Sequence, residues 1–231
     1  MARELKGRGH RLLGIRLDSG DLAYLSKRAR VQLDQAGLHH VRIIASNQLD
    51  EYVIRSLLEQ DAPIDAFGVG TRLITGQDSA ALDGVYKLSM CDGRPRLKFS
   101  ENFTKITLPG IKRIIRFTNG EGLFYADAVA SDHDELPDVI YHPFFPEKKS
   151  SLKNLTPSRL MDPVMEKGVA AGISTVQESA AYARERLELL SPEHKRFENP
   201  HVYKVGITRT VLELRSKLMK DLNHRNSTAG P

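Results

Sequence analysis

The sequence of 231 residues has little cysteine, no tryptophan and no long apolar run. A single cysteine, Cys91, excludes an intrachain disulfide and a zinc site built from several cysteines. No stretch approaches the roughly 20 apolar residues of a membrane span. Residues 1–10 are charged and lack the apolar segment of a signal peptide. We therefore expect a cytoplasmic protein that does not act at a membrane.

Clusters of like charge are also missing. Lys and Arg outnumber Asp and Glu by 34 to 29 and the isoelectric point is about 9.3, but no three Lys or Arg residues are consecutive. Aromatic residues make up 6% of the chain, too few for the interleaved stacking platforms of single-strand binders. We expect no nucleic-acid partner, whereas a basic site for a small phosphorylated molecule is compatible with the charge.

What is present in the first 84 residues is a repeated pattern of strand, turn and helix. Three apolar segments of strand length follow one another: Leu12–Leu17, Val41–Ser46 and Ile64–Gly70. Asp18 or Ser19 is a suitable N-cap for the first helix, and Asn47 or Asp50 for the second. Repeated βα units predict parallel strands, and ligands bind at the carboxyl ends of such strands. The predicted fold class is α/β, with this unit spanning residues 1–84.

The pattern changes after Gly84. Turn residues at Asp92–Pro95 predict a hairpin, and alternating apolar segments up to residue 150 predict an antiparallel β meander. Residues 151–231 are expected to be helical, with three helices and a disordered tail from about Asn223. The predicted helices span 160–169, 176–190 and 211–222.

Arg16 and Asp18 are the first candidate site residues. They are two positions apart on a strand, so both side chains point to the same side. The guanidinium complements a carboxylate or phosphate, and the carboxylate can accept hydrogen bonds from sugar hydroxyls. The alternative is an ion pair at a strand end, with Asp18 serving only as a helix cap.

Two further strand ends carry small polar residues. Gly68-Val-Gly-Thr71 can present backbone N–H groups and a hydroxyl to a phosphate, although it lacks the lysine of a Walker P-loop. Ser46 and Asn47 occupy the equivalent end of the preceding strand. A tight turn is the plain alternative for either segment taken alone, so the hypothesis depends on three such turns at consecutive strand ends.

Together these segments resemble the carboxyl-terminal half of nicotinate phosphoribosyltransferase. The residues that carry the resemblance are Gly14-Ile-Arg-Leu-Asp-Ser-Gly-Asp21, Ile44–Glu51, Phe67–Thr71, Gly84–Leu88, Pro95–Ser100, Lys105–Gly110 and Asn199–Tyr203. The resemblance implies part of an irregular (β/α) barrel of the quinolinate phosphoribosyltransferase type. It also implies transfer of phosphoribose from 5-phosphoribosyl 1-diphosphate to nicotinate, coupled to ATP hydrolysis, in NAD salvage.

The resemblance also assigns roles to residues. Arg16 would contact nicotinate and Asp18 the ribose hydroxyls. The 5-phosphate would be held by Ser46, Asn47, Gly68, Gly70 and Thr71. Mg²⁺ would bind the diphosphate and need few protein ligands. The family implies a homodimer, or a complementing amino-terminal half for a chain of this length.

No catalytic residue is assigned within this sequence. In the family a histidine is transiently phosphorylated by ATP, and none of the eight histidines here stands in a matching context. We therefore expect the chain to be a fragment or split subunit that is inactive alone. One alternative is a non-catalytic partner that binds phosphoribosyl diphosphate or regulates a full-length enzyme. Another is nicotinamide phosphoribosyltransferase, whose signature has Pro where Leu17 stands.

Overall fold

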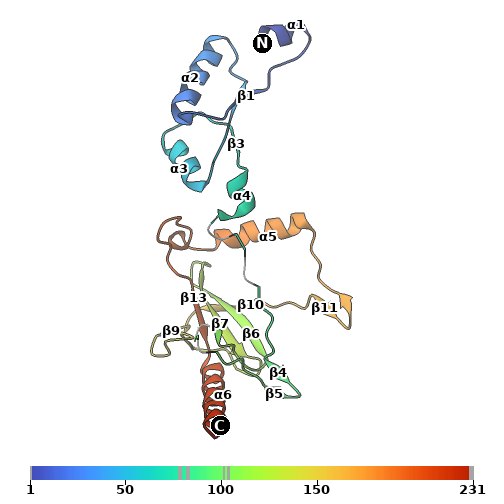
Figure 1. Ribbon diagram of the computed structural model, residues 1–231, viewed down its shortest axis with the longest axis vertical. Helices are drawn as coiled ribbons and strands as arrows, with labels where there is room; N and C mark the ends of the chain where they lie inside the picture. Colours follow the sequence, from blue (N-terminus) through green and yellow to red (C-terminus); the bar gives the residue numbers. More distant parts are fainter. Residues whose placement is uncertain (1, 78–79, 82–83, 101, 103–104, 229–231) are drawn as a thin grey trace. The chain divides into compact units, whose positions relative to one another are not determined.

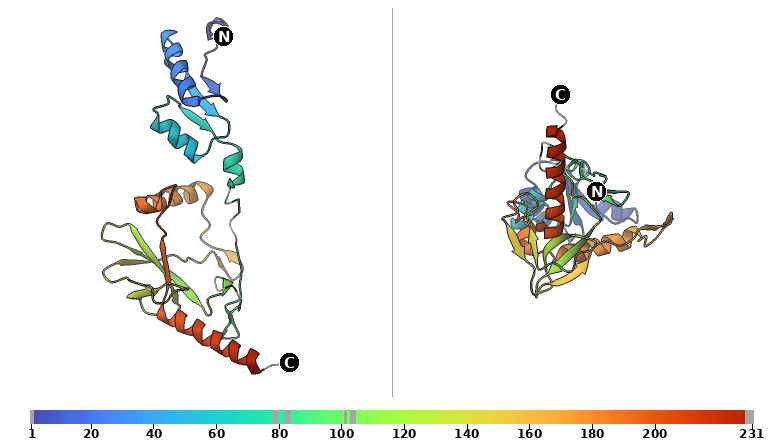
Figure 2. Two further views of the ribbon diagram at one scale, coloured as in Figure 1. Left: turned by 60° about the vertical axis from the view of Figure 1, so that its left-hand side comes forward. Right: turned by 90° about the horizontal axis from the view of Figure 1, so that it is seen from below.

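The computed structural model describes residues 2–77, 80–81, 84–100, 102 and 105–228. The chain divides into two compact units, Met1–Gly84 and Val85–Pro231. Figures 1 and 2 show their helices and strands. No helix among the described residues is long and apolar enough to cross a bilayer.

The first unit is a parallel sheet with a helix after each strand, as the repeated pattern predicts. Its elements are α1 (Ala2–Gly7), β1 (Gly14–Leu17), α2 (Leu22–Gln35), β2 (Arg42–Ser46), α3 (Glu51–Glu59), β3 (Ala66–Gly68) and α4 (Thr71–Thr75). The three strands lie side by side in the order β1–β2–β3, and both pairings are parallel. The carboxyl ends of the strands therefore meet at one edge of the sheet.

The N-caps fix where the helices begin. Asp21 caps α2, since its carboxylate accepts a hydrogen bond from the Tyr24 N–H at 3.0 Å. The expectation that Asp18 or Ser19 fills this role is wrong, because the chain first turns through Gly20 at a φ of 76°. Asp50 caps α3 by accepting from the Val53 N–H at 2.9 Å, so of the two expected caps Asp50 is the one used.

Helices α2 and α3 cover the same face of this sheet (Figures 1 and 2). Ala23 of α2, Ala45 of β2 and Leu57 of α3 form its buried cluster together with Leu49. Because side chains alternate along a strand, Ile44 and the residues in line with it lie on the opposite face. That face carries Arg16, which pairs in register with Ile44.

The second unit contains a six-stranded mixed sheet. Its elements are β4 (Met90–Cys91), β5 (Arg94–Pro95), β6 (Lys112–Thr118), β7 (Phe124–Ser131), β8 (Val139–Tyr141), β9 (Lys149–Ser151), β10 (Thr156–Arg159), β11 (Met165–Glu166), β12 (Val169–Ala170), α5 (Val176–Glu188), the 3₁₀ turn η3 (Pro192–His194), β13 (Lys204–Ile207) and α6 (Arg209–Thr228). The sheet order is β10–β6–β7–β13–β8–β9. The expected hairpin at Asp92–Pro95 is present as β4 and β5.

The structure corrects the expectation of a simple meander followed by helices. Strand β13 lies between β7 and β8 and pairs parallel to β7, so a strand near the end of the chain completes the sheet. Strand β10 adds to the other edge, against β6. Residues 151–231 therefore contribute strands as well as helices. A segment as short as Lys204–Ile207, which follows a polar loop and directly precedes α6, gives too weak a pattern to predict its pairing.

One further expectation in this part of the chain is wrong. The predicted helix over 160–169 is instead the hairpin β11–β12, because Lys167 and Gly168 both have left-handed φ, of 49° and 81°. Helix α6 extends as far as Thr228, and the expectation of a disordered tail from about Asn223 stays a prediction. Residues 229–231 lie outside the described part of the chain.

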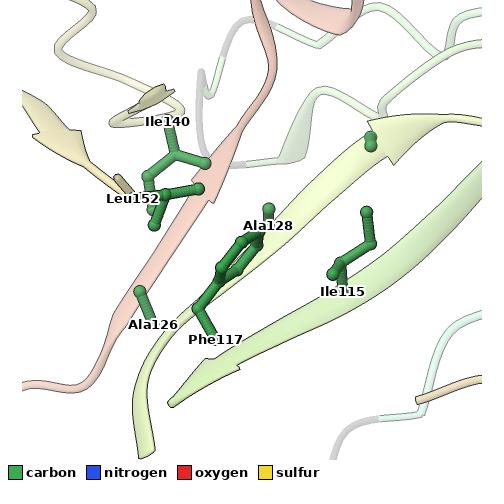
Figure 3. Packing of buried hydrophobic residues seen from close by; sticks show 7 residues of the cluster. Ile115, Phe117, Ala126, Ala128, Ile140 and Leu152 are labelled. Carbon is green, nitrogen blue, oxygen red and sulfur yellow. The ribbon is translucent and has the colours of Figure 1, made fainter. Parts of the chain in front are cut away.

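The core of the second unit lies against β6 and β7. Figure 3 shows the side chains of Ile115 and Phe117 beside Ala126 and Ala128, with Ile140 and Leu152 nearby. The members of this cluster are Ile115, Phe117, Ala126, Ala128, Ala130, Ile140 and Leu152. Alternate alanines on β7 leave room for the larger side chains around them.

Candidate phosphate and carboxylate site

The register of the first sheet places the three candidate segments next to one another. Leu17 pairs with Ala45, Ala45 with Phe67, and Ser46 with Gly68. A Cβ on Gly68 would lie 3.4 Å from that of Ser46, so these two strand ends are in contact. Asp18 directly follows Leu17. The sequence hypothesis of adjacent strand ends is therefore confirmed for its geometry.

A cavity of about 600 Å³ opens at this edge of the sheet. It is lined by Asn47, Gln48, Leu49, Gly68, Gly70, Thr71 and Arg72. Four of the predicted site residues line this one cavity: Asn47, Gly68, Gly70 and Thr71. Ser46 is not in the lining, but it pairs with Gly68, which is. Among these lining residues the charged side chain is a guanidinium, and none is a carboxylate, so the cavity suits an anion.

The backbone after β2 is held in an unusual conformation. Asn47 and Gln48 follow each other with left-handed φ values of 85° and 45°. Such conformations cost on the order of 1–3 kcal/mol each and gather at functional sites. They redirect the chain after Ser46, so that the residues that follow line the cavity.

The cavity wall on the β3 side comes from the short segment between β3 and α4. Gly70 is the N-cap of α4 and makes no side-chain hydrogen bond to the helix. Glycines at 68 and 70 add no side chain, and both are exposed. Backbone N–H groups and the Thr71 hydroxyl are therefore accessible from the cavity.

Arg16 and Asp18 make an ion pair at the end of β1. Arg16 Nη2 lies 2.8 Å from Asp18 Oδ2, and the two side chains are 65% and 54% exposed. The structure therefore shows the ion pair that the sequence offered as the alternative to a ligand site. The other part of that alternative, in which Asp18 caps the helix, is wrong, because Asp21 is the N-cap. An ion pair this exposed contributes at most about 1 kcal/mol, so a ligand can take over either partner at small cost.

One cavity residue, Arg72, was absent from the sequence hypothesis. It is the residue after Thr71 and supplies the cation of the cavity. Its position immediately after Gly68-Val-Gly-Thr71 was the signal available in the sequence, because a cation beside backbone N–H groups strengthens an anion site. The conformation of Gln48 had no such signal, since left-handed φ is rare for this residue type.

The structure defines an α/β protein with a cavity at the carboxyl ends of parallel strands. Residues 111–215 match the family model of the nicotinate phosphoribosyltransferase C-terminal domain. A nicotinate phosphoribosyltransferase of Bacillus subtilis is 37% identical over 91% of this chain and 46% of its own length. That of Dictyostelium discoideum is 34% identical over 92% of this chain and 40% of its own length. The chain is thus a relative of the nicotinate phosphoribosyltransferases, as its motifs indicate.

A solved structure extends this likeness to the fold. The crystal structure of human nicotinic acid phosphoribosyltransferase matches with a TM-score of 0.70 at 26% identity, over 91% of this chain and 41% of that chain. The chain therefore spans less than half the length of the relatives that it matches.

Proposed function

We propose that this chain supplies the substrate-binding strand ends of a nicotinate phosphoribosyltransferase, which forms nicotinate mononucleotide and diphosphate from nicotinate and 5-phosphoribosyl 1-diphosphate. The observation that carries the proposal is the cavity that unites Asn47, Gly68, Gly70 and Thr71 with the cation of Arg72. Relatives that cover most of the chain bear this enzyme's name, which favours it over a non-catalytic partner.

The 5-phosphate is assigned to this cavity. Its dianion would accept hydrogen bonds from backbone N–H groups at Gly68 and Gly70, from the Thr71 hydroxyl and from Arg72. Ser46 and Asn47 would close the side next to β2. Because no carboxylate lines the cavity, these donors have no anionic acceptor in the protein. A phosphate would provide one, and a neutral ligand would not.

Nicotinate and the ribose are assigned to the end of β1. Arg16 would exchange the carboxylate of Asp18 for that of nicotinate, which retains a charge-assisted hydrogen bond. Asp18, once released, would accept hydrogen bonds from the ribose hydroxyls. The small free energy of the exposed ion pair makes this exchange feasible.

Magnesium and ATP are the cofactors that the family implies. No group of three or more His, Cys, Asp or Glu residues that could hold a metal ion occurs among the described residues. We propose that Mg²⁺ arrives on the diphosphate of the substrate, which provides oxygen ligands of its own. No described residue is assigned to ATP.

Calorimetric titration of the chain with 5-phosphoribosyl 1-diphosphate and Mg²⁺ tests the phosphate assignment. We expect saturable binding that Thr71→Val weakens by about 1.5–3 kcal/mol, roughly tenfold to a hundredfold in Kd. Thr75→Val is the matched control, since Thr75 lies on the same short helix and is not among the residues that line the cavity. Equal losses of affinity in Thr71→Val and Thr75→Val would contradict the assignment of the 5-phosphate to this cavity.

Turnover is a separate measurement. The prediction that the chain alone forms no nicotinate mononucleotide from radiolabelled nicotinate, phosphoribosyl diphosphate and ATP stays a prediction. The same assay in the presence of an amino-terminal half from a relative tests whether this chain completes an enzyme. Product in that mixture, lost with Thr71→Val, is the expected result.

A further inference from the structure

A second and larger cavity lies in the first unit, at the amino ends of β1 and β2 rather than at their carboxyl ends. Its volume is about 780 Å³. It is lined by Ala2, Arg3, Lys6, His10, Arg11, Leu12, Ala36, Gly37, Leu38 and His40. We call it the basic cavity. None of these residues belongs to the site assigned to the substrates.

Two helix ends build this cavity. Helix α1 closes with a hydrogen bond of 2.8 Å from the His10 N–H to the Leu5 carbonyl, and the chain turns through Gly9 at a φ of 78°. Helix α2 closes in the same manner, with 2.8 Å from the Leu38 N–H to the Leu33 carbonyl and a φ of 71° at Gly37. Both chain segments are thereby directed from a helix end toward a strand, and they enclose the cavity between them.

The charge of the basic cavity is uncompensated. Arg3, Lys6 and Arg11 are charged at neutral pH, and the lining adds His10 and His40 but no carboxylate. None of these five side chains pairs with an acidic residue in the part of the chain that the structure describes. Arg8 on the same segment, by contrast, has its carboxylate partner in Glu4 at 2.8 Å.

The helix ends do not cancel this charge. The carboxyl end of a helix carries about half a negative charge, so two ends supply about one. The three positive charges of Arg3, Lys6 and Arg11 exceed that amount. The cavity therefore attracts anions, and a ligand with several negative charges is needed to neutralise it.

We propose that the basic cavity binds a ligand that carries two or more linked phosphate groups. A volume of about 780 Å³ lies within the range of roughly 300–1,000 Å³ that is typical of small-molecule sites. Leu12 and Leu38 add apolar lining that an uncharged part of such a ligand can contact. The proposal does not depend on the proposed function, because it concerns other residues at the other end of the sheet.

Calorimetric titration of the full chain with inorganic tripolyphosphate tests this site. The variant Arg3→Gln with Lys6→Gln removes one arginine and one lysine from the cavity, and we expect it to weaken binding at least tenfold. The matched control is Arg8→Gln with Lys27→Gln, which removes the same charges from exposed positions outside the cavity. We expect a change of less than about threefold for that control, because neither side chain lines the cavity and Arg8 is already paired with Glu4.

The outcomes separate this cavity from the proposed substrate site. If Arg72→Gln abolishes tripolyphosphate binding and the Arg3 and Lys6 variant leaves it unchanged, the anion binds at the strand ends and the proposal is overturned. Equal losses from the cavity variant and its control would also overturn it, since binding would then follow net charge alone. Inorganic phosphate is the second probe, and affinity equal to that of tripolyphosphate would contradict the requirement for linked phosphates.

Discussion

The guanidinium of Arg116 on β6 binds the carboxylate of Asp127 on β7 through two hydrogen bonds, of 2.8 and 2.7 Å. The two residues are direct register partners in the sheet. The Tyr203 hydroxyl donates a third hydrogen bond to Asp127 at 3.0 Å. Burial, and next the charge of Asp127, raise the pKa of Tyr203 well above its usual range, so this hydroxyl stays a donor.

Removing the charge of Asp127 tests this network. Asp127 is 8% exposed, so Asp127→Asn would leave the largely buried cation of Arg116 without a negative charge beside it and with one acceptor oxygen in place of two. We expect the free energy of unfolding to fall by about 3 kcal/mol, measured by urea denaturation at pH 7. The double variant Arg116→Met with Asp127→Leu should recover most of that loss, although Tyr203 then lacks its acceptor. A double variant as unstable as Asp127→Asn would show that packing, and not the unpaired charge, causes the effect.

Gly206 offers a packing test in the same sheet. A Cβ at this position would lie 2.7 Å from the Cβ of Ile140 on the neighbouring strand β8, closer than real Cβ atoms approach other heavy atoms. We expect Gly206→Ala to lower the free energy of unfolding by about 1–3 kcal/mol. Gly120→Ala is the control, because nothing lies within 4 Å of a Cβ there. Equal effects of the two substitutions would contradict this account.

Asp134 provides a pH-dependent test. Burial alone raises the pKa of this carboxyl, but hydrogen bonds from Thr208 and Thr210 and from the Ser131 N–H outweigh it, so the pKa lies below its usual value. A lowered pKa in the folded state gives stability that is present above the unfolded pKa, near 4, and lost as pH falls through the folded value.

Comparing the wild type with Asp134→Asn at several pH values measures that contribution. At pH 7 we expect the variant to be less stable by about 1–2 kcal/mol, since Thr208 Oγ1 loses a charged acceptor 2.6 Å away. The difference should shrink as pH falls below about 4, because the carboxyl is protonated first in the unfolded state and only at lower pH in the folded protein. A difference that is constant from pH 7 to pH 3 would show that Asp134 acts through its shape and not its charge.

The first sheet was predictable from sequence because each of its signals is local. Apolar segments of strand length, each followed by a helical pattern, identify β1, β2 and β3, and a parallel arrangement follows from their connections. The meeting of Ser46 with Gly68 follows in turn from that arrangement. Local signals did not predict the left-handed conformation of Gln48 or the N-cap at Asp21. Both depend on the path of the chain between a strand and the next helix.

The second sheet was less predictable because its pairings are distant in sequence. Strand β13 pairs with β7 across nearly 80 residues, as Ala126 opposite Lys204 shows. The segment 165–170 has apolar residues at a spacing that is compatible with a helix. It forms a hairpin instead, because Lys167 and Gly168 adopt left-handed φ values. Tertiary pairing and turn geometry therefore override the local pattern here.

The end of β1 yields the prediction that bears most directly on substrate choice. If Arg16 exchanges Asp18 for the carboxylate of nicotinate, Arg16→Ala should weaken nicotinate binding by about 1.5–3 kcal/mol. Affinity for 5-phosphoribosyl 1-diphosphate should change far less, because its 5-phosphate is assigned to the cavity of Thr71. Thr71→Val should show the reverse preference. Calorimetric titrations of both ligands, on this chain together with an amino-terminal half from a relative, would measure the two losses.

Asp18→Asn refines the same test, since it removes the internal competitor for Arg16 while keeping the side-chain size. Nicotinate affinity should then rise by less than about 1 kcal/mol, the most that an exposed ion pair contributes. Phosphoribosyl diphosphate affinity should fall, because the ribose hydroxyls lose a charged acceptor. Equal losses of both ligands in Arg16→Ala, or a loss of nicotinate affinity in Asp18→Asn, would contradict the exchange and leave the pair with a structural role alone.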